Sequence, residues 1–273
     1  MGNTYDLYRL LSKPENLIED LIEYINSFDV DWKDRLRGCS EKKIKKLIDV
    51  SSIEYNGYKL PESYINYLRY MGEDDGGLLG NLYAGYYSID ILIEDYPDWR
   101  SDKYGYVELE NSQFAFFIGE MSNEPIYIME FIDKTNYYIS INGGKYIESF
   151  DKFLYRMALQ QQNFLKSEGK ILDFEYMMNF WINDNEDEKM INSIGENILK
   201  IIENIGNKYN YKRLWFSDKW AYLAQKEKGI MESKIDNKFF GRVRCNDINE
   251  IYNIKKELEE LEEIRFIYKI YYK

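Results

Sequence analysis

Residues 60–72 read LPESYINYLRYMG, and this stretch predicts a short amphipathic helix. Pro61 suits the first helical turn, because the N–H that proline lacks would have no partner there. Gly72 suits the position after the last turn, where glycine adopts a left-handed conformation without strain. Between them, apolar and aromatic residues recur at helical spacing, at Tyr64, Ile65, Tyr67, Leu68 and Met71.

Two further helices are predicted upstream of this stretch. Ser40 is placed to cap a helix whose Ile44, Leu47 and Ile48 fall on one face. The earlier segment Glu15–Phe28 has the same apolar periodicity. The N-terminal part of the chain is therefore predicted to be mainly helical.

Downstream of the polar residues 73–77, EDDGG, the pattern changes to strands. Three short runs rich in β-branched and aromatic residues are separated by turn signals, at Phe114–Ile118, Pro125–Phe131 and Tyr137–Ile141. Ser149 then caps a closing helix. Helices, antiparallel strands and a final helix, in that order, predict an α+β fold.

The rest of the chain predicts a second α+β unit with no sequence repeat of the first. We expect a helix at Glu188–Ile205, a hairpin of Leu214–Phe216 with Tyr222–Ala224, a strand at Phe239–Val243, a helix at Asp247–Leu261 and a last strand at Ile264–Tyr272. A polar seam lies near residues 160–169, and 273 residues suffice for two small domains. We therefore predict domains at residues 1–164 and 165–273.

The composition excludes several classes of function. The chain has no histidine, so it has no Ser-His-Asp or Cys-His nucleophile pair and no histidine-bound zinc. Its net charge of −12 argues against nucleic acid and anionic membranes as partners. Cys39 and Cys245 are too few for a disulfide framework or a four-thiolate metal site. We expect no cofactor, no metal and two reduced, structural thiols.

The acidic residues are concentrated in one region. Residues 1–164 hold 28 acidic and 17 basic side chains, whereas residues 165–273 hold 20 and 19. Within the first part, residues 49–133 hold 17 acidic and 4 basic residues, a net charge of −13. We call residues 49–133 the acidic belt. Just before it, residues 33–46 carry seven basic side chains, which we expect on a solvated helix face or paired with the belt.

The order of these motifs resembles the SUKH superfamily, the Smi/Knr group. The family has a capped helix, then the motif LP-x-x-Y-x-x-[FY]-L at the start of the next helix, and a glycine-rich polar loop. Here these parts correspond to Ser40, residues 60–68 and residues 73–77, and the strands with the SFDKFL of residues 149–154 resemble its sheet and closing helix. The resemblance covers roughly residues 36–160. Residues 165–273 resemble no family that we recognise.

The resemblance implies a SUKH-like α+β domain that binds protein and catalyses nothing. Bacterial members are typically cytoplasmic immunity proteins that neutralise a cognate toxin, often a nuclease. A nuclease has a basic substrate groove, and an acidic partner would be steered toward it. We therefore expect an immunity protein that binds a basic toxin through its acidic belt. The second domain would widen that interface or form a homodimer.

Within the belt, carboxylates and aromatic anchors together make the candidate binding site, because interface hot spots combine aromatic residues with a charged rim. The candidate residues are Glu73, Asp74, Asp75, Tyr86, Tyr87, Glu94, Asp95, Asp98 and Trp99. The alternative is an ordinary solvated surface. A second function class is an intracellular scaffold or regulator without a toxin partner, and a third, weaker one is a carboxylate-dependent hydrolase.

Other patterns favour structural roles. Glu108 and Glu110 alternate on one face of a strand, and residues 184–188 lack the spacing of a calcium loop. The glycine-rich residues 76–80 lack phosphate-loop spacing and predict a turn with positive φ. The aromatic residues between Leu214 and Tyr222 are expected in the core. A basic leader before an apolar run and an apolar stretch of membrane-spanning length are both missing from the sequence, so we expect a cytoplasmic protein.

Overall fold

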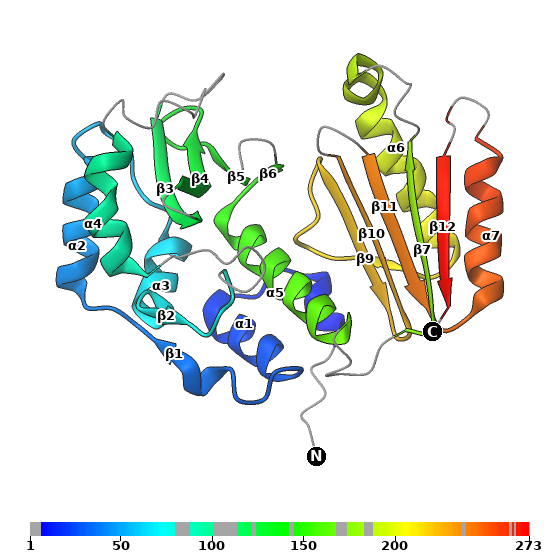
Figure 1. Ribbon diagram of the computed structural model, residues 1–273, viewed down its shortest axis with the longest axis horizontal. Coiled ribbons are helices and arrows are strands. Elements are labelled where there is room, and N and C mark those ends of the chain that lie inside the picture. The colour runs from blue at the N-terminus through cyan, green and yellow to red at the C-terminus, as the bar shows by residue number, and fades with distance from the viewer. Residues whose placement is uncertain are drawn as a thin grey trace. The chain divides into compact units, whose positions relative to one another are not determined.

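The computed structural model describes most of the chain. The described residues are 7–79, 88–100, 114–121, 124–141, 145–167, 174–182, 188–235, 239–261, 264 and 266–272. They fall into two compact units (Figure 1). The first unit contains Pro14–Glu168, and the second contains Gly169–Lys273 together with the N-terminal segment Asp6–Lys13. The sequence-based division at residue 164 had placed that N-terminal segment in the first domain.

The first unit begins with helices joined by a small β-pair. The elements in order are α1 (Leu17–Asn26), the 3-10 turn η2 (Lys33–Arg35), β1 (Leu36–Arg37), α2 (Glu41–Ser51), α3 (Glu62–Met71), β2 (Asp74–Asp75) and α4 (Ile89–Arg100). Strands β1 and β2 pair antiparallel, with Leu36 opposite Asp75. As predicted, Ser40 caps α2, because its hydroxyl accepts a hydrogen bond from the Lys43 N–H.

A four-stranded antiparallel sheet and a long helix complete the first unit. The sheet has the order β3 (Phe114–Met121), β4 (Glu124–Phe131), β5 (Tyr137–Ile141) and β6 (Lys145–Ile147). Helix α5 (Phe150–Ser167) follows, and the Ser149 hydroxyl accepts from the Lys152 N–H in its first turn. The α+β class, three of these strands and both serine caps are thus confirmed, whereas β6 was not predicted.

Aromatic side chains from α3 fill the core of the first unit. The Tyr64 ring packs edge-on against Phe116 of β3 and Phe150 of α5, with centroids 5.6 and 4.9 Å apart. Tyr67 also packs against Phe150. Such edge-to-face pairs add about 0.5–1.5 kcal/mol each beyond the area that they bury. The predicted inner face of this helix is therefore the contact that joins the helices to the sheet.

Both ends of α3 differ from the sequence prediction in detail. Pro61 is the residue before the helix, with extended backbone angles, and the helix begins at Glu62. Gly72 has φ of −73°, so it is right-handed, not left-handed. A Cβ on Gly72 would lie 2.6 Å from the Leu68 carbonyl oxygen and 2.9 Å from the Cys39 sulfur. Glycine is therefore required at this position by close packing.

The second unit is a six-stranded antiparallel sheet with two long helices. In chain order the elements are η1 (Leu7–Leu11), β7 (Tyr176–Ile182), α6 (Glu188–Lys208), β8 (Lys212–Arg213), β9 (Ala221–Lys226), β10 (Gly229–Ile235), β11 (Phe239–Cys245), α7 (Ile248–Glu259) and β12 (Phe266–Tyr272). The strand order in the sheet is β12-β7-β11-β10-β9-β8. The helices α6 and α7, β11 and β12 match the predicted elements, and Asp247 caps α7.

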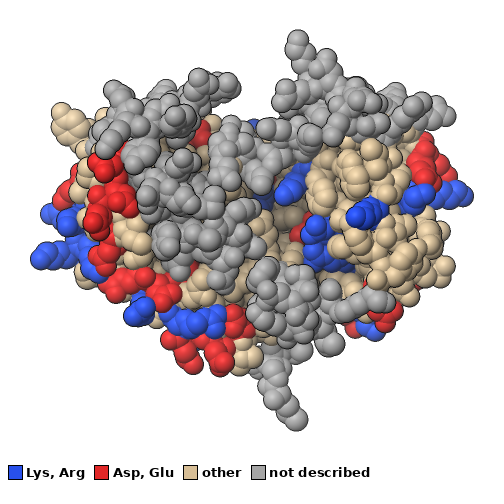
Figure 2. All heavy atoms as spheres, in the orientation of Figure 1, with Lys and Arg blue, Asp and Glu red and all other residues tan. Residues whose placement is uncertain are grey.

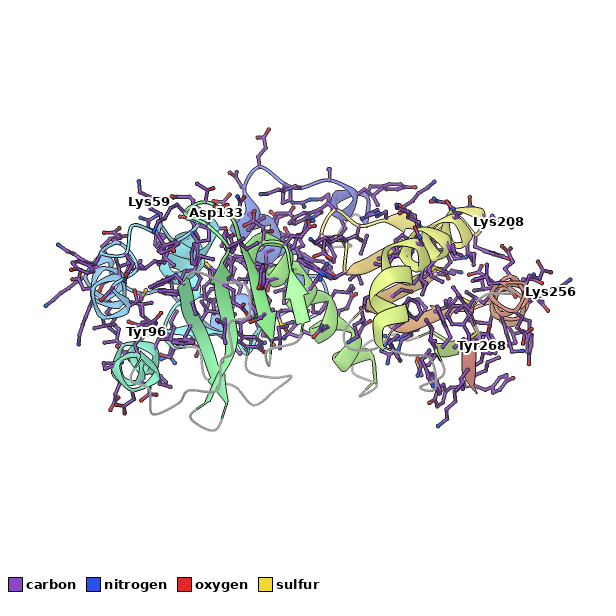
Figure 3. All side chains as sticks on the ribbon, turned by 90° about the horizontal axis from the view of Figure 1, so that it is seen from above. Lys59, Tyr96, Asp133, Lys208, Lys256 and Tyr268 are labelled. Atoms are coloured by element: carbon purple, nitrogen blue, oxygen red, sulfur yellow. The ribbon has the colours of Figure 1, made fainter. Side chains whose placement is uncertain are left out.

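Both helices of the second unit pack on the same face of its sheet. One hydrophobic core joins Ile198 and Ile202 of α6, Ile254 of α7, and strand residues such as Phe180 and Val243. Figure 3 shows the two helices on one side of the sheet, with Lys208 and Lys256 marking them. The opposite face of the sheet therefore carries the alternate residues of each strand.

Two sequence predictions for the second unit are wrong or incomplete. Leu214–Phe216 is a turn segment, and β9 pairs with the two-residue β8 and with β10. The predicted core role is confirmed for Leu214, Phe216 and Tyr222, which are buried, whereas Trp215 and Trp220 are half-buried. Strands β7 and β10 were not predicted, although β7 lies between β12 and β11 and β10 between β11 and β9.

We predict that Gly76 and Gly57 respond differently to alanine, although both have positive φ, of 65° and 77°. A Cβ at Gly76 would lie 2.5 Å from Nε1 of the buried Trp32, whereas at Gly57 the nearest atom is the Lys134 ammonium at 3.5 Å, an ordinary van der Waals distance. Gly57→Ala should cost about 1–2 kcal/mol of backbone strain. Gly76→Ala should lower the free energy of unfolding by about 1–3 kcal/mol more than Gly57→Ala does, because Trp32 must move to make room for the methyl group.

Urea denaturation of the two variants checks this difference. Equal losses of unfolding free energy would show that Trp32 accommodates the added methyl group.

Candidate functional site

The candidate site is built around the turn that follows α3. Asp75 is fully buried, and its carboxylate accepts four hydrogen bonds. Oδ2 accepts from the Tyr67 hydroxyl at 3.1 Å and from the Leu79 N–H at 3.0 Å, and Oδ1 accepts from the N–H groups of Gly77 and Leu78 at 2.9 Å. The backbone of this turn is therefore organised around one carboxylate.

Asp75 is therefore not a partner-binding residue, which corrects the sequence prediction. This carboxylate has no exposed surface and already accepts four hydrogen bonds within the chain, so a partner protein cannot contact it. The predicted turn is confirmed, because Gly76 and Gly77 have φ of 65° and 87°. Glycine reaches these angles without the clash that a Cβ would cause.

Glu73 and Asp74 are half-buried and paired with basic residues. Lys43 Nζ lies 2.7 Å from Glu73 Oε1 and also 2.7 Å from Asp90 Oδ2, so one ammonium on α2 joins the turn to α4. Arg37 lies 3.0 Å from Asp74 across the β1–β2 pair. Hydrogen bonds from Lys43 to Asp90 and Glu73 raise the pKa of this lysine above its ordinary value. The expected pairing of the basic segment with the acidic belt is confirmed at these two residues.

Helix α4 carries a row of exposed carboxylates. Asp90, Glu94 and Asp98 follow one another at a spacing of four residues and are all exposed, while Asp95 is half-buried. Figure 2 shows acidic side chains gathered where α4 lies in Figure 1, next to basic side chains over α2. We call Asp90, Glu94 and Asp98 the α4 acidic row.

The α4 acidic row works against the stability of its own helix. Like charges four residues apart destabilise a helix by about 0.2–0.5 kcal/mol per pair. Lys43 offsets this at Asp90, and Glu94 and Asp98 lie one and two turns further along. Their arrangement is therefore not required by the packing of α4, whose buried side is formed by Ile89, Leu92 and Tyr96.

Asp90 was not among the residues predicted from the sequence. Asp90, Glu94 and Asp98 are spaced four residues apart in the sequence. This spacing places them on one face only if Ile89–Arg100 is a helix, which was not predicted. The aromatic candidates Tyr86 and Tyr87 lie outside the described residues. Trp99 lies in α4, and its side chain is outside the description. Glu108, Glu110 and most of residues 184–188 are likewise outside the described ranges.

The two cysteines have the environment of structural thiols. Cys39 is buried and donates to the Leu68 carbonyl at 3.0 Å, and Cys245 is buried beside the Asp247 carbonyl at 3.2 Å. Burial raises the pKa of each thiol to about 11. A thiol held in the protonated form is a poor nucleophile and a poor metal ligand.

The described residues contain neither a cluster of metal ligands nor a helix that could span a membrane. No three His, Cys, Asp or Glu side chains among them are grouped as a metal site would require. Within the same ranges, none of the helices combines the length and apolar character needed to cross a bilayer.

Comparisons with known proteins yield no relative. The chain matches no protein-family model, no curated protein and no solved structure.

We predict that Asp75 and Asp74 differ sharply when replaced by alanine, although they are neighbours. Asp75→Ala leaves the Tyr67 hydroxyl and three turn N–H groups without their acceptor. Each buried unsatisfied group costs about 1–3 kcal/mol, so a loss of about 3 kcal/mol or more is expected. Asp74→Ala should lose less, about 1–2 kcal/mol, because it removes one acceptor, that of the Gly76 N–H at 3.0 Å, and an ion pair with the largely exposed Arg37.

Chemical denaturation of both variants measures this difference. A loss at Asp74 as large as that at Asp75 would contradict the structural role of the buried carboxylate.

Both thiols should resist modification in the folded protein at pH 8. Because the pKa is raised from 9.0 to about 11, the thiolate fraction below pH 9 is about 100-fold lower than that of an unperturbed thiol, and it increases as the pH rises toward 11. Reaction with an aromatic disulfide reagent, followed with and without urea, measures this protection. A thiol that reacts equally fast in both conditions would be exposed and reactive.

Proposed function

We propose that this protein is a SUKH-type immunity protein, which binds and neutralises a basic toxin through the acidic surface of α4. The observation that carries the proposal is the α4 acidic row, in which the exposed Glu94 and Asp98 continue the line of charge beyond the ion pair of Asp90 with Lys43. In this proposal the protein acts by occupying the toxin surface and not by catalysis, inside the cell where the toxin would act.

The order of elements in the first unit supports the SUKH assignment. The capped helix α2 is followed by α3, whose start carries the LPESY motif, and then by the glycine turn. An antiparallel sheet and the closing helix α5 come next, in the order that the motifs of this family suggest.

The charges in the first unit support a basic partner. Residues 49–133 carry a net charge of −13, and the ion pairs of Lys43 and Arg37 neutralise only the part of this charge near the turn. Exposed carboxylates that face a basic groove accelerate association, to as much as about 10⁸–10⁹ M⁻¹s⁻¹ at low salt. A nuclease toxin, whose groove binds phosphates, is the partner class that fits best.

The proposal is tested with the protein encoded by the adjacent gene, which in this proposal carries the toxin domain. The double variant Glu94→Lys/Asp98→Lys reverses two charges of the α4 acidic row. A matched control, Glu227→Lys/Glu260→Lys, reverses two exposed carboxylates of the second unit. The α4 variant should slow association by about tenfold or more at low salt, and co-expressing cells should lose protection. The control should do neither.

Two outcomes would contradict this proposal. If the two double variants behave alike, the α4 acidic row is not the binding surface. If the neighbouring domain does not bind and several unrelated proteins are retained instead, a scaffold function replaces the immunity function.

A further inference from the structure

The second unit has a sheet face that its helices do not cover. Because α6 and α7 share one core with the inward residues of the strands, the alternate residues point to the opposite side. On β7, β11, β10 and β12 these outward residues are Met177, Asn179, Trp181, Phe240, Arg242, Arg244, Ile230, Glu232, Lys234, Ile267, Lys269 and Tyr271. We call the part carried by β7, β11, β12 and the end of β10 the outer sheet face.

The strand register arranges the outer sheet face in rows. One row runs from Ile267 through Trp181 and Phe240 to Lys234, each residue opposite the next on the neighbouring strand. The adjacent row contains Lys269, Asn179, Arg242 and Glu232. Neighbouring strands are about 4.8 Å apart and alternate residues of a strand about 6.8 Å apart. Aromatic and cationic side chains therefore lie within one short span of sheet.

The outer sheet face is basic although the whole chain is acidic. On β7, β10, β11 and β12 its cations are Lys234, Arg242, Arg244 and Lys269, against the single carboxylate of Glu232, which lies 3.9 Å from the Arg242 guanidinium. Lys234 and Lys269 are exposed, whereas Arg244 is only 9 % exposed. Toward β9 the face is buried, with Ile230 at 1 % and Leu223 at 8 % exposure. The accessible part is therefore the end formed by β7, β11 and β12.

The cations of this face are placed around the aromatic rings. The Arg242 guanidinium lies 5.2 Å from the Phe240 ring centroid, and its Nε donates to Asn179 Oδ1 at 2.9 Å. Lys234 Nζ lies 5.9 Å from the same centroid. Lys269 Nζ lies 5.0 Å from the centroid of Tyr271. Such a surface offers π-faces and positive charge together, at separations of a few ångströms.

We propose that the outer sheet face binds single-stranded nucleic acid. Unpaired bases stack on aromatic side chains of open sheets, and phosphates are held by nearby lysine and arginine. Here Trp181 and Phe240, on adjacent strands and in register and each half-buried, supply the stacking platform. Lys234, Arg242 and Lys269 supply the charges along its two sides. Duplex DNA does not fit this surface, because its bases are already stacked and its exterior offers the rings nothing to stack on.

The acidic net charge does not exclude this ligand. Residues 1–164 hold −11 of the net −12, while residues 165–273 are nearly neutral at −1. At physiological salt the Debye length is about 8 Å, so charges within the outer sheet face dominate the local potential. An acidic helix is the main competing ligand. It would pair with the cations of this face but would make no use of the aromatic rings of Trp181 and Phe240.

Because it concerns the second unit alone, this inference does not depend on the proposed toxin partner. The test uses the full chain with a fluorescent oligothymidylate and a fluorescent oligouridylate. Each is about 12 nucleotides long, a length within the range of site sizes of single-strand-binding surfaces. A duplex of equal length and a peptide with the sequence of Ile89–Arg100 are the competitors. Fluorescence anisotropy is measured at two salt concentrations.

Phe240→Leu should weaken binding about tenfold, because it keeps the apolar volume and removes the π-face, while Phe240→Tyr should retain binding. Lys269→Gln should weaken binding and reduce the slope of log affinity against log salt by about 0.7. The control Lys256→Gln removes an exposed cation from α7, on the other side of the sheet, and should change neither quantity.

Three results would overturn the inference. One is the absence of binding to both oligonucleotides at low salt. Another is equal weakening by Lys269→Gln and Lys256→Gln, which would indicate only diffuse charge attraction. The third is displacement of the oligonucleotide by the acidic peptide, together with an oligonucleotide affinity that Phe240→Leu leaves unchanged. This result would indicate that the face binds an acidic protein surface.

Discussion

The buried carboxylate of Asp75 is the interaction on which the first unit depends. It binds the Tyr67 hydroxyl on α3 and the backbone of the turn at residues 77–79, and the Tyr127 hydroxyl on β4 donates to the carbonyl of Leu79 in turn. Helix, turn and sheet are thereby joined through one charged group. Burying a carboxylate without hydrogen-bond donors is strongly unfavourable in free energy, and the buried donors would in turn be left without an acceptor. The carboxylate and its donors therefore stabilise one another.

This arrangement divides the acidic belt into structural and exposed parts. Asp75 is buried, and Glu73 and Asp74 are held beside it by Lys43 and Arg37. Because Lys43 also binds Asp90, the same ion pairs fix the start of α4 and orient the rest of its acidic row. Helix α4 therefore offers a partner exposed carboxylates in a row, while those of the turn are engaged in contacts within the unit.

Local signals in the sequence predicted much of the fold. Caps at Ser40 and Ser149 and apolar periodicity identified their helices, because these signals act within one or two turns. Helix α4 was missed although Ile89, Leu92, Ile93 and Tyr96 have helical spacing, since Pro97 and the acidic residues obscure it. Strand β10 was missed as well, and so was the burial of Asp75. The role of Asp75 depends on donors that only the folded chain brings together, such as the Tyr67 hydroxyl on α3 and the turn N–H groups.

The acidic surface of the first unit is proposed to bind a basic toxin domain. This is tested by calorimetric titration of the unmodified full chain with the protein encoded by the adjacent gene, at low and at physiological salt. We expect a 1:1 complex whose affinity falls as salt rises, because exposed charges carry the attraction. An affinity that does not change with salt, or no binding at either concentration, would contradict it.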